Sequence, residues 1–325
     1  MSIYKELSYS QDVDTISGIQ FSIMSAEEIE SRSVAEIVST DTFAGNDPII
    51  GGLFDPRMGV IDHNKICQTC EQKNTFCPGH FGHIVLAKPL FYIQFFDIVK
   101  KIMKCICFKC SKLLIDKNQS ELKKILNKKI SRQKKFEAIY KICSKNKIKR
   151  CGKEIENNGC GCRQPDKITK DTHVGRILLE WKMKGEDENE EDNNLIYFAE
   201  DIYRIFARIT EEDSNILGFP RSINRPENLI CTIFPVPPPA VRPSVRNDTG
   251  QRCCDDLTHK LCDIVKTNNT LKTKIEKEVN KDQIDYWTIL LQYHLSTFID
   301  NKIPGIPQAK QRTGRPLRSL TERLK

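Results

Sequence analysis

The feature that most constrains this chain is a group of metal-ligating residue types between positions 67 and 80. Two half-sites, Cys67-Gln-Thr-Cys70 and Cys77-Pro-Gly-His80, are separated by six residues. A two-residue gap lets both side chains of a half-site face one ion, and three thiolates with one imidazole form a tetrahedral set that structural zinc prefers. The proline and glycine of the second half-site favour a turn back toward the ion. The spacing therefore predicts a structural zinc site rather than four unrelated buried side chains.

A second group of cysteines follows, in two parts separated by a long insertion. The first part holds Cys105, Cys107 and Cys110, and the second holds Cys151, Cys160 and Cys162. The C-x2-C spacing of Cys107 and Cys110 repeats the first half-site, so two of the distal thiols would complete a second zinc site. The alternative is a set of reduced cysteines packed in a subdomain.

The cysteine count bears on the cellular compartment. The chain has 325 residues and fourteen cysteines, and residues 1–10 lack the apolar segment of a signal peptide. A reducing compartment, in which thiols bind metal rather than form disulfides, fits this sequence better than secretion. The most apolar run, residues 84–103, is interrupted by charged residues and a proline, so it cannot cross a bilayer. We expect a soluble protein of about two domains.

Hydrophobic periodicity predicts a mixture of helices and short strands. Ser25 and Glu28 form a capping box that would begin a helix extending to Ile37. Further helices are expected over residues 91–103, 194–209, 255–279 and 282–299, with two amphipathic helices within 121–149. Strands are expected over 84–88, ended by Pro89, and over 230–234, before a stiff extended proline-rich strap at 235–243. This pattern predicts an α+β fold with an antiparallel helical hairpin at 255–300, in which His294 is an interface histidine rather than a ligand.

Positive charge gathers at the end of the chain. Of the formal net charge of +8, much lies after residue 300, where the basic residues face only Glu322. The cationic residues predicted to bind nucleic acid are Lys310, Arg312, Arg315, Arg318, Arg323 and Lys325. Interleaved glycines and prolines predict a flexible basic loop, and the arginine fork suits phosphate. The alternative is a solvated tail.

Several motifs together resemble one family. They occur in the family's order from about residue 15 to the last residue: Asp55-Pro-Arg-Met-Gly59, the two half-sites at 67–80 with Phe81-Gly-His-Ile84, the Pro235-Val-Pro-Pro-Pro strap with Val241-Arg-Pro243, Asp255-Asp-Leu-Thr258 and Gly314-Arg-Pro316. The chain resembles the N-terminal region of the largest subunit of multisubunit DNA-directed RNA polymerases. The nearest form is that of eukaryotic RNA polymerase II. Lys, Asn and Ile are frequent, as in AT-rich genomes, which allows a protist or a large DNA virus as host.

The resemblance implies a zinc-stapled clamp module that closes over template DNA and the RNA–DNA hybrid. It assigns one structural zinc to Cys67, Cys70, Cys77 and His80, and the second to Cys107, Cys110, Cys151 and Cys160. Cys105, Cys143 and Cys162 stay outside these sets, although Cys162 is close to Cys160 in the sequence. The order of motifs implies a clamp core at 1–104 and a clamp-head zinc subdomain at 105–165. The rest of the clamp covers 166–300, and a truncated basic segment covers 301–325.

The resemblance also implies roles for the later segments and for partners. The hairpin at 255–300 would be a docking surface for initiation and elongation factors. The loop at 242–251 resembles the lid, residues 301–314 the rudder, and residues 315–325 the start of a switch segment. The second-largest and the smaller polymerase subunits would be partners, with no membrane involved. The location would be the nucleus in a cell, or a cytoplasmic factory or virion for a virus.

Catalysis is expected to lie elsewhere. The family adds nucleotides with magnesium held by an Asn-Ala-Asp-Phe-Asp-Gly-Asp motif, and this motif does not occur in the sequence. We therefore expect no catalytic residue here, with magnesium only in the missing catalytic part. The chain would be a fragment of a longer subunit or a split gene product. The alternatives are a free-standing zinc-dependent nucleic-acid-binding transcription regulator and a cytosolic thiol oxidoreductase.

Overall fold

The computed structural model describes residues 16–325 except 20, 46, 118, 147, 153–158, 172–174, 182–193 and 247–251. The predicted α+β class is confirmed. Helices are α1 Ala26–Arg32, α2 Phe96–Cys105, α3 Ser120–Leu126, α4 Arg132–Asn146, α5 Ala199–Ala207, α6 Glu211–Leu217, α7 Asp256–Glu276, α8 Lys281–Ile299 and α9 Leu320–Leu324. Strands are β1 Phe43–Ala44, β2 Asp47–Pro48, β3 Gly82–Phe91, β4 Lys167–Asp171, β5 Arg176–Glu180, β6 Leu195–Tyr197, β7 Ile230–Val236, β8 Val245–Arg246 and β9 Arg252–Cys253. Half of the segment that resembles the lid, residues 247–251, lies outside the described residues.

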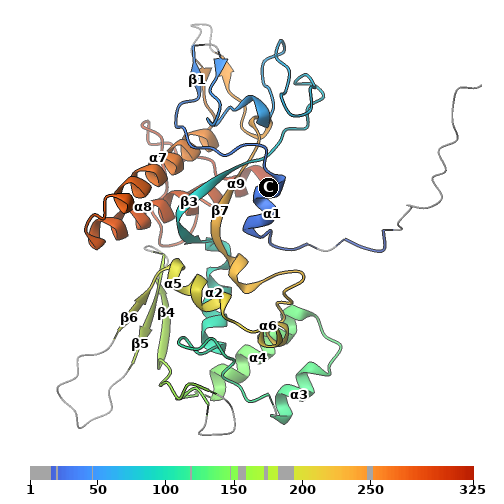
Figure 1. Ribbon diagram of the computed structural model, residues 1–325, viewed down its shortest axis with the longest axis vertical. Helices are drawn as coiled ribbons and strands as arrows, with labels where there is room; N and C mark the ends of the chain where they lie inside the picture. The colour runs from blue at the N-terminus through green and yellow to red at the C-terminus, as the bar shows by residue number, and fades with distance from the viewer. Residues whose placement is uncertain are drawn as a thin grey trace, which may run out of the picture.

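The antiparallel pair β3–β7 runs through the centre of the molecule and joins two hydrophobic cores (Figure 1). One core gathers α2 to α6 and the three-stranded sheet β4–β5–β6. The other gathers β3 and β7 with the facing sides of α7 and α8. Strand β3 contributes to both, since Phe91 is buried in the first core and Ile84 in the second. The two strands therefore connect the halves of the fold.

Strand β3 does not end at Pro89, as the sequence had predicted. It continues to Phe91, and its register against β7 shifts between Val85 and Leu90. Proline has no N–H to donate, so a strand can contain it only where the ladder is interrupted, which is what this shift provides.

Two buried amide side chains from the helical hairpin hydrogen-bond to the β3 backbone. Asn268 of α7 accepts from the N–H of Ala87 at 2.8 Å and donates to the carbonyl of Val85 at 2.9 Å. Gln292 of α8 accepts from Phe91 N–H at 2.8 Å and donates to Phe91 O at 2.9 Å. Buried backbone groups need partners, and these amides supply them where the strand ladder is irregular.

The antiparallel helical hairpin is confirmed as α7 and α8, and the two helices within the 121–149 insertion are α3 and α4. Other predicted boundaries differ. The capping box of Ser25 and Glu28 is present, but α1 ends at Arg32 rather than Ile37. The predicted helix over 194–209 is divided into β6 and α5, because Leu195 and Ile196 pair with β5. The strap is not extended throughout, since Pro239–Val241 form a 3-10 turn.

None of the helices among the described residues combines the length and the apolar character needed to span a membrane.

Candidate metal centres and the basic segment

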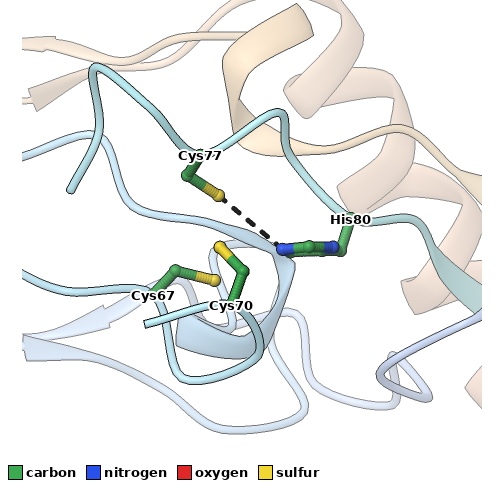
Figure 2. Close-up of side chains that lie close together, drawn as sticks. All are labelled: Cys67, Cys70, Cys77 and His80. Carbon is green, nitrogen blue, oxygen red and sulfur yellow. Dashed lines mark hydrogen bonds between the residues drawn. The ribbon is translucent and has the colours of Figure 1, made fainter. Parts of the chain in front are cut away.

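The first centre brings together the four residues that the sequence predicted between positions 67 and 80. Their ligand atoms all lie within 4.8 Å of one another. Cys77 Sγ lies 3.7 Å from His80 Nε2, and Figure 2 shows the four side chains pointing toward a common point. A tetrahedral ion with zinc–sulfur bonds of about 2.3 Å separates its sulfur ligands by about 3.8 Å. The arrangement therefore fits a four-coordinate zinc ion.

The second centre joins Cys107 and Cys110 to Cys151 and Cys160, again with ligand atoms within 4.8 Å. Cys107 Sγ lies 3.6 Å from Cys160 Sγ, and Cys110 Sγ lies 3.5 Å from Cys151 Sγ. These separations fit the same tetrahedron. The two clusters are compatible with two zinc ions, and Cys162 does not belong to the second one as the side chains stand.

Both centres begin with the same chain turn. Cys67 N–H donates to Gln72 O at 3.0 Å, and Cys107 N–H donates to Lys112 O at 2.8 Å. The residue after the second cysteine of each turn is left-handed, with φ of 56° at Glu71 and 61° at Ser111. This turn aims backbone N–H groups at the first sulfur, as Thr69 N–H shows at 3.4 Å from Cys67 Sγ.

Gln164 supports the second centre. Its Nε2 donates to Cys107 Sγ at 3.2 Å and to the carbonyl of Cys162 at 3.0 Å, and the side chain is buried. A hydrogen bond to a ligand sulfur holds it in place and offsets part of its negative charge. Nothing in the sequence around Gln164 identifies Cys107 as its partner.

The thiols of each centre have pKa values shifted in opposite directions. Burial raises the pKa of Cys67, but N–H donors from Cys70 and Thr69 outweigh it, so the net shift is downward. Burial raises the pKa of Cys77 to about 11, and the neighbouring thiols add to this increase. Thiolates that share one site without a cation raise each other's pKa. A divalent ion offsets the repulsion between the thiolates, so that the coordinated thiols are deprotonated.

The first centre is attached to an ion pair between buried Asp55 and partly exposed Arg57. The fully buried carboxylate of Asp55 accepts from Gly51 N–H at 2.6 Å and from Arg57 Nη2 at 2.7 Å. Burial alone raises the pKa of Asp55, but these donors lower it below its usual value. Thr69 Oγ1 donates to Arg57 O at 2.7 Å, which connects the ion pair to the metal-binding turn.

Arg242 anchors the proline-rich strap beside this centre. Its guanidinium is completely buried and donates to Pro237 O at 2.9 Å, to Leu53 O and to Thr258 Oγ1 at 3.5 Å. Burial lowers its pKa to about 10. The arginine therefore joins the strap, the loop before the first centre and α7.

The basic segment is a structured hairpin and not a flexible loop, which corrects the prediction. Gln311 N–H donates to Arg315 O at 2.8 Å, and Leu317 N–H donates to Ala309 O at 2.9 Å. Buried Asn301 closes its base, donating to Ala309 O at 2.9 Å and to Leu317 O at 2.8 Å. The glycine of the turn, Gly314, has a φ of 86°, which side chains rarely adopt.

The prediction that these basic residues face only Glu322 is also wrong. Lys302 does pair with Glu322 at 2.6 Å. In addition, the buried Asp256 lies 3.4 Å from Arg315 Nη2, and Asp255 pairs with Arg323. Both carboxylates lie at the start of α7, and the sequence offered no signal for such distant pairs.

Asp256 also accepts from Gln311 Nε2 at 2.7 Å and from the backbone N–H of Arg318 at 3.1 Å, which holds the basic hairpin in place.

The remaining cations of the segment point outward. Lys310, Arg312 and Lys325 are exposed and form no ion pair within the part of the chain that the structure describes. The segment therefore presents cations to solvent from a fixed backbone.

His294 lies in the α7–α8 interface, as predicted, and is not part of either metal cluster. Its Nδ1 is 2.8 Å from Nζ of buried Lys260. Burial, and then the charge of Lys260, lower the pKa of His294 to about 4. Burial likewise lowers the pKa of Lys260 to about 8. The neutral imidazole accepts the hydrogen bond from the ammonium group.

Comparison with known protein families gives a match over nearly the whole chain. The model of the family described as RNA polymerase Rpb1, domain 1, matches residues 13–325. The matched range includes both metal clusters, the helical hairpin and the basic segment.

Proposed function

Because this chain belongs to the RNA polymerase Rpb1 domain 1 family, which forms the N-terminal region of the largest subunit of DNA-directed RNA polymerase, we propose that it is a zinc-braced clamp. In this proposal it grips template DNA and the RNA–DNA hybrid during transcription. The polymerase is a nucleotidyltransferase, and this chain supplies grip rather than chemistry. Magnesium belongs to carboxylates in another part of the enzyme.

The observation that carries the proposal is the basic hairpin. Its backbone is fixed by Asn301 and Asp256, while Lys310 and Arg312 are exposed at its edge and tip. Cations on a fixed backbone bind phosphates without first losing conformational freedom. Such contacts position a nucleic acid without reading its sequence.

The six predicted cations divide into two groups in this proposal. Lys310, Arg312, Arg318 and Lys325 make the first phosphate contacts. Arg315 and Arg323 reach phosphate only by leaving Asp256 and Asp255, with which they pair. The carboxylates thus reduce the positive field while no nucleic acid is bound, and they orient the arginines.

Zinc is the structural ion in the proposal. Cys67, Cys70, Cys77 and His80 hold one ion, and Cys107, Cys110, Cys151 and Cys160 hold the other. A closed tetrahedral site keeps no open position for substrate, so zinc here stabilises chain turns. This role fits centres that are built from chain turns and lie far along the sequence from the basic hairpin.

The partners follow from the same proposal. The second-largest and smaller polymerase subunits surround the clamp, and the α7–α8 hairpin receives initiation and elongation factors. The protein then works in the nucleus of a cell, or in a cytoplasmic factory or virion if the host is a virus.

Binding of the full chain to a short RNA–DNA hybrid tests the proposal. Wild-type affinity should fall steeply with salt, and Lys310→Ala/Arg312→Ala should reduce the magnitude of the slope of log K against log salt by about two. Lys123→Ala/Lys124→Ala on α3 removes the same charge from two exposed positions and serves as the control. A flat salt response, or equal effects of the two variants, would contradict the proposal.

Co-purification separates the clamp from the free-standing regulator. A clamp associates with other polymerase subunits in the cell. A chain that binds the hybrid but associates with none of them would support the regulator instead.

A further inference from the structure

The second metal centre has a fifth thiol beside its four candidate ligands. Cys162 follows Cys160 by two residues, with Gly161 between them at a φ of 67°. Its thiol interacts with that of Cys160 and lies near that of Cys110. The first centre offers four ligand residues and no fifth among the described residues.

The backbone of Cys162 is fixed at this place. Its carbonyl accepts from Cys151 N–H at 3.0 Å and from Gln164 Nε2 at 3.0 Å. Cys162 N–H in turn donates to Cys160 Sγ. The α-carbon of Cys162 is therefore held next to the centre by the ligands themselves and by the residue that supports Cys107.

The side chain of Cys162 is held much more weakly than its backbone. Its thiol contacts the carbonyl of Arg163 at 3.7 Å and the thiol of Cys160, and a thiol is a weak donor and a weak acceptor. Rotation about χ1 moves between staggered wells without disturbing the backbone. Little therefore keeps the sulfur from turning toward the ion.

Cys160 is the ligand best placed to leave. It is exposed, whereas Cys107 and Cys151 are buried, and Cys107 Sγ also accepts a hydrogen bond from Gln164 at 3.2 Å. A solvent-facing sulfur is the one that water, oxidants and alkylating agents reach first.

We propose that Cys160 and Cys162 share one coordination position of the second centre, so that Cys162 binds the zinc ion when Cys160 does not. This inference rests on the proposal that the centre binds zinc. In the exchange one Zn–S bond breaks and another forms, and the proton that Cys162 gives up goes to Cys160. The ion stays Zn²⁺ with four ligands, and no electron is transferred. When the Cys160 thiol has been lost to chemical modification, the proton of Cys162 passes to water instead, and the centre keeps its ion.

Zinc content of purified full-length variants tests the inference. Cys160→Ser and Cys162→Ser should each retain about two zinc ions per chain, and the double variant should retain about one. Cys70→Ser at the first centre is the matched control, because it has no spare thiol and should fall to about one. A folded Cys160→Ser that holds about one zinc overturns the inference, and so does a Cys160→Ser that cannot be obtained folded when Cys162→Ser can.

A second measurement distinguishes this inference from the proposed zinc sites themselves. In cobalt-substituted protein the sulfur-to-metal absorption grows with the number of bound thiolates, so Cys160→Ser should keep the wild-type intensity and the double variant should lose part of it. If the wild-type chain binds fewer than two metal ions, the proposed pair of zinc sites fails. If wild type binds two and Cys160→Ser loses absorption, only the exchange fails.

Discussion

The two metal centres begin with the same type of chain turn, but the chain between their two half-sites differs greatly in length. Between the inner ligands the chain spans 7 positions in the first centre, from Cys70 to Cys77, and 41 in the second, from Cys110 to Cys151. Helices α3 and α4 lie within the longer span. The first centre therefore stabilises a local loop, while the second fixes a tertiary arrangement.

Loop-closure entropy gives the difference a magnitude. Closing the longer span costs an unfolded chain about 1 to 2 kcal/mol more, because this cost rises with the logarithm of loop length. The ion of the second centre therefore offsets a larger entropic cost of loop closure than the ion of the first centre. The predictions below test this asymmetry.

The largest effect is expected for Cys110→Ser. Loss of the second ion should lower the free energy of unfolding by on the order of 5 kcal/mol, since binding to a structural site contributes directly to folding. Hydrogen exchange should show that amides of α3 and α4 lose protection while those of α7 and α8 keep it. Uniform loss of protection over the whole chain would argue against a separate role for this centre.

Cys70→Ser should destabilise the protein less, on the order of 3 kcal/mol, because the loop that it releases is short. Protection should fall within residues 59–83 and remain in α3 and α4. Chemical denaturation of both serine variants gives the comparison directly. A larger loss for Cys70→Ser than for Cys110→Ser would reverse the asymmetry proposed here.

A pair of glycine substitutions probes the surroundings of each centre. Gly79 has a φ of 81°, and a Cβ there would lie 2.7 Å from Cβ of Pro238, whereas a Cβ at Gly161 meets nothing within 4 Å. Gly79→Ala should therefore cost about 3 kcal/mol, from strain and overlap together. Gly161→Ala should cost about 1 kcal/mol from the backbone alone. Thermal unfolding measures both, and equal costs would show that the strap does not press on the first centre.

A smaller effect is expected for the acid sensitivity of His294, which lies outside both centres. Its contribution to the loss of stability must be subtracted before the two centres are compared by acidification. The folded-state pKa of His294 is about 4, below its usual 6.5, so the unfolded state binds more protons between these values. The stability contributed by neutral His294 is complete above about pH 6.5 and is lost as pH falls toward 4. His294→Gln keeps an acceptor for Lys260 and should remove about 2 kcal/mol of the loss between pH 7 and pH 5. An unchanged pH profile would place all acid sensitivity elsewhere.

The same contrast explains what could be predicted from sequence. The first centre follows from spacing alone, because all its ligands are sequence neighbours. For the second, the spacing identified Cys107 and Cys110, but the choice among distal thiols needed a family pattern. The positive φ of Gly161 and the hydrogen bonds of Cys162 could not be predicted, because they form only when the chain after α4 folds back to the first half-site.

Errors in the sequence prediction occurred where distant segments meet. The basic segment was predicted to be flexible from its glycines and prolines, while the carboxylates that pair with it, Asp255 and Asp256, lie far upstream in the chain. Strand β3 was predicted to stop at Pro89 because proline cannot donate to a strand ladder. The side chains that support the strand around this point, Asn268 and Gln292, come from another part of the sequence. The zinc-site ligands, domain limits and nucleic-acid contacts stay predictions for the experiments above.

The amide contacts of Asn268 and Gln292 have a mechanical consequence. They attach each helix of the hairpin to a different point of β3, near Ala87 and at Phe91. Two attachment points fix an angle as well as a position. A force applied at the free end of the α7–α8 hairpin therefore acts as a torque on β3, the strand that contributes to both hydrophobic cores.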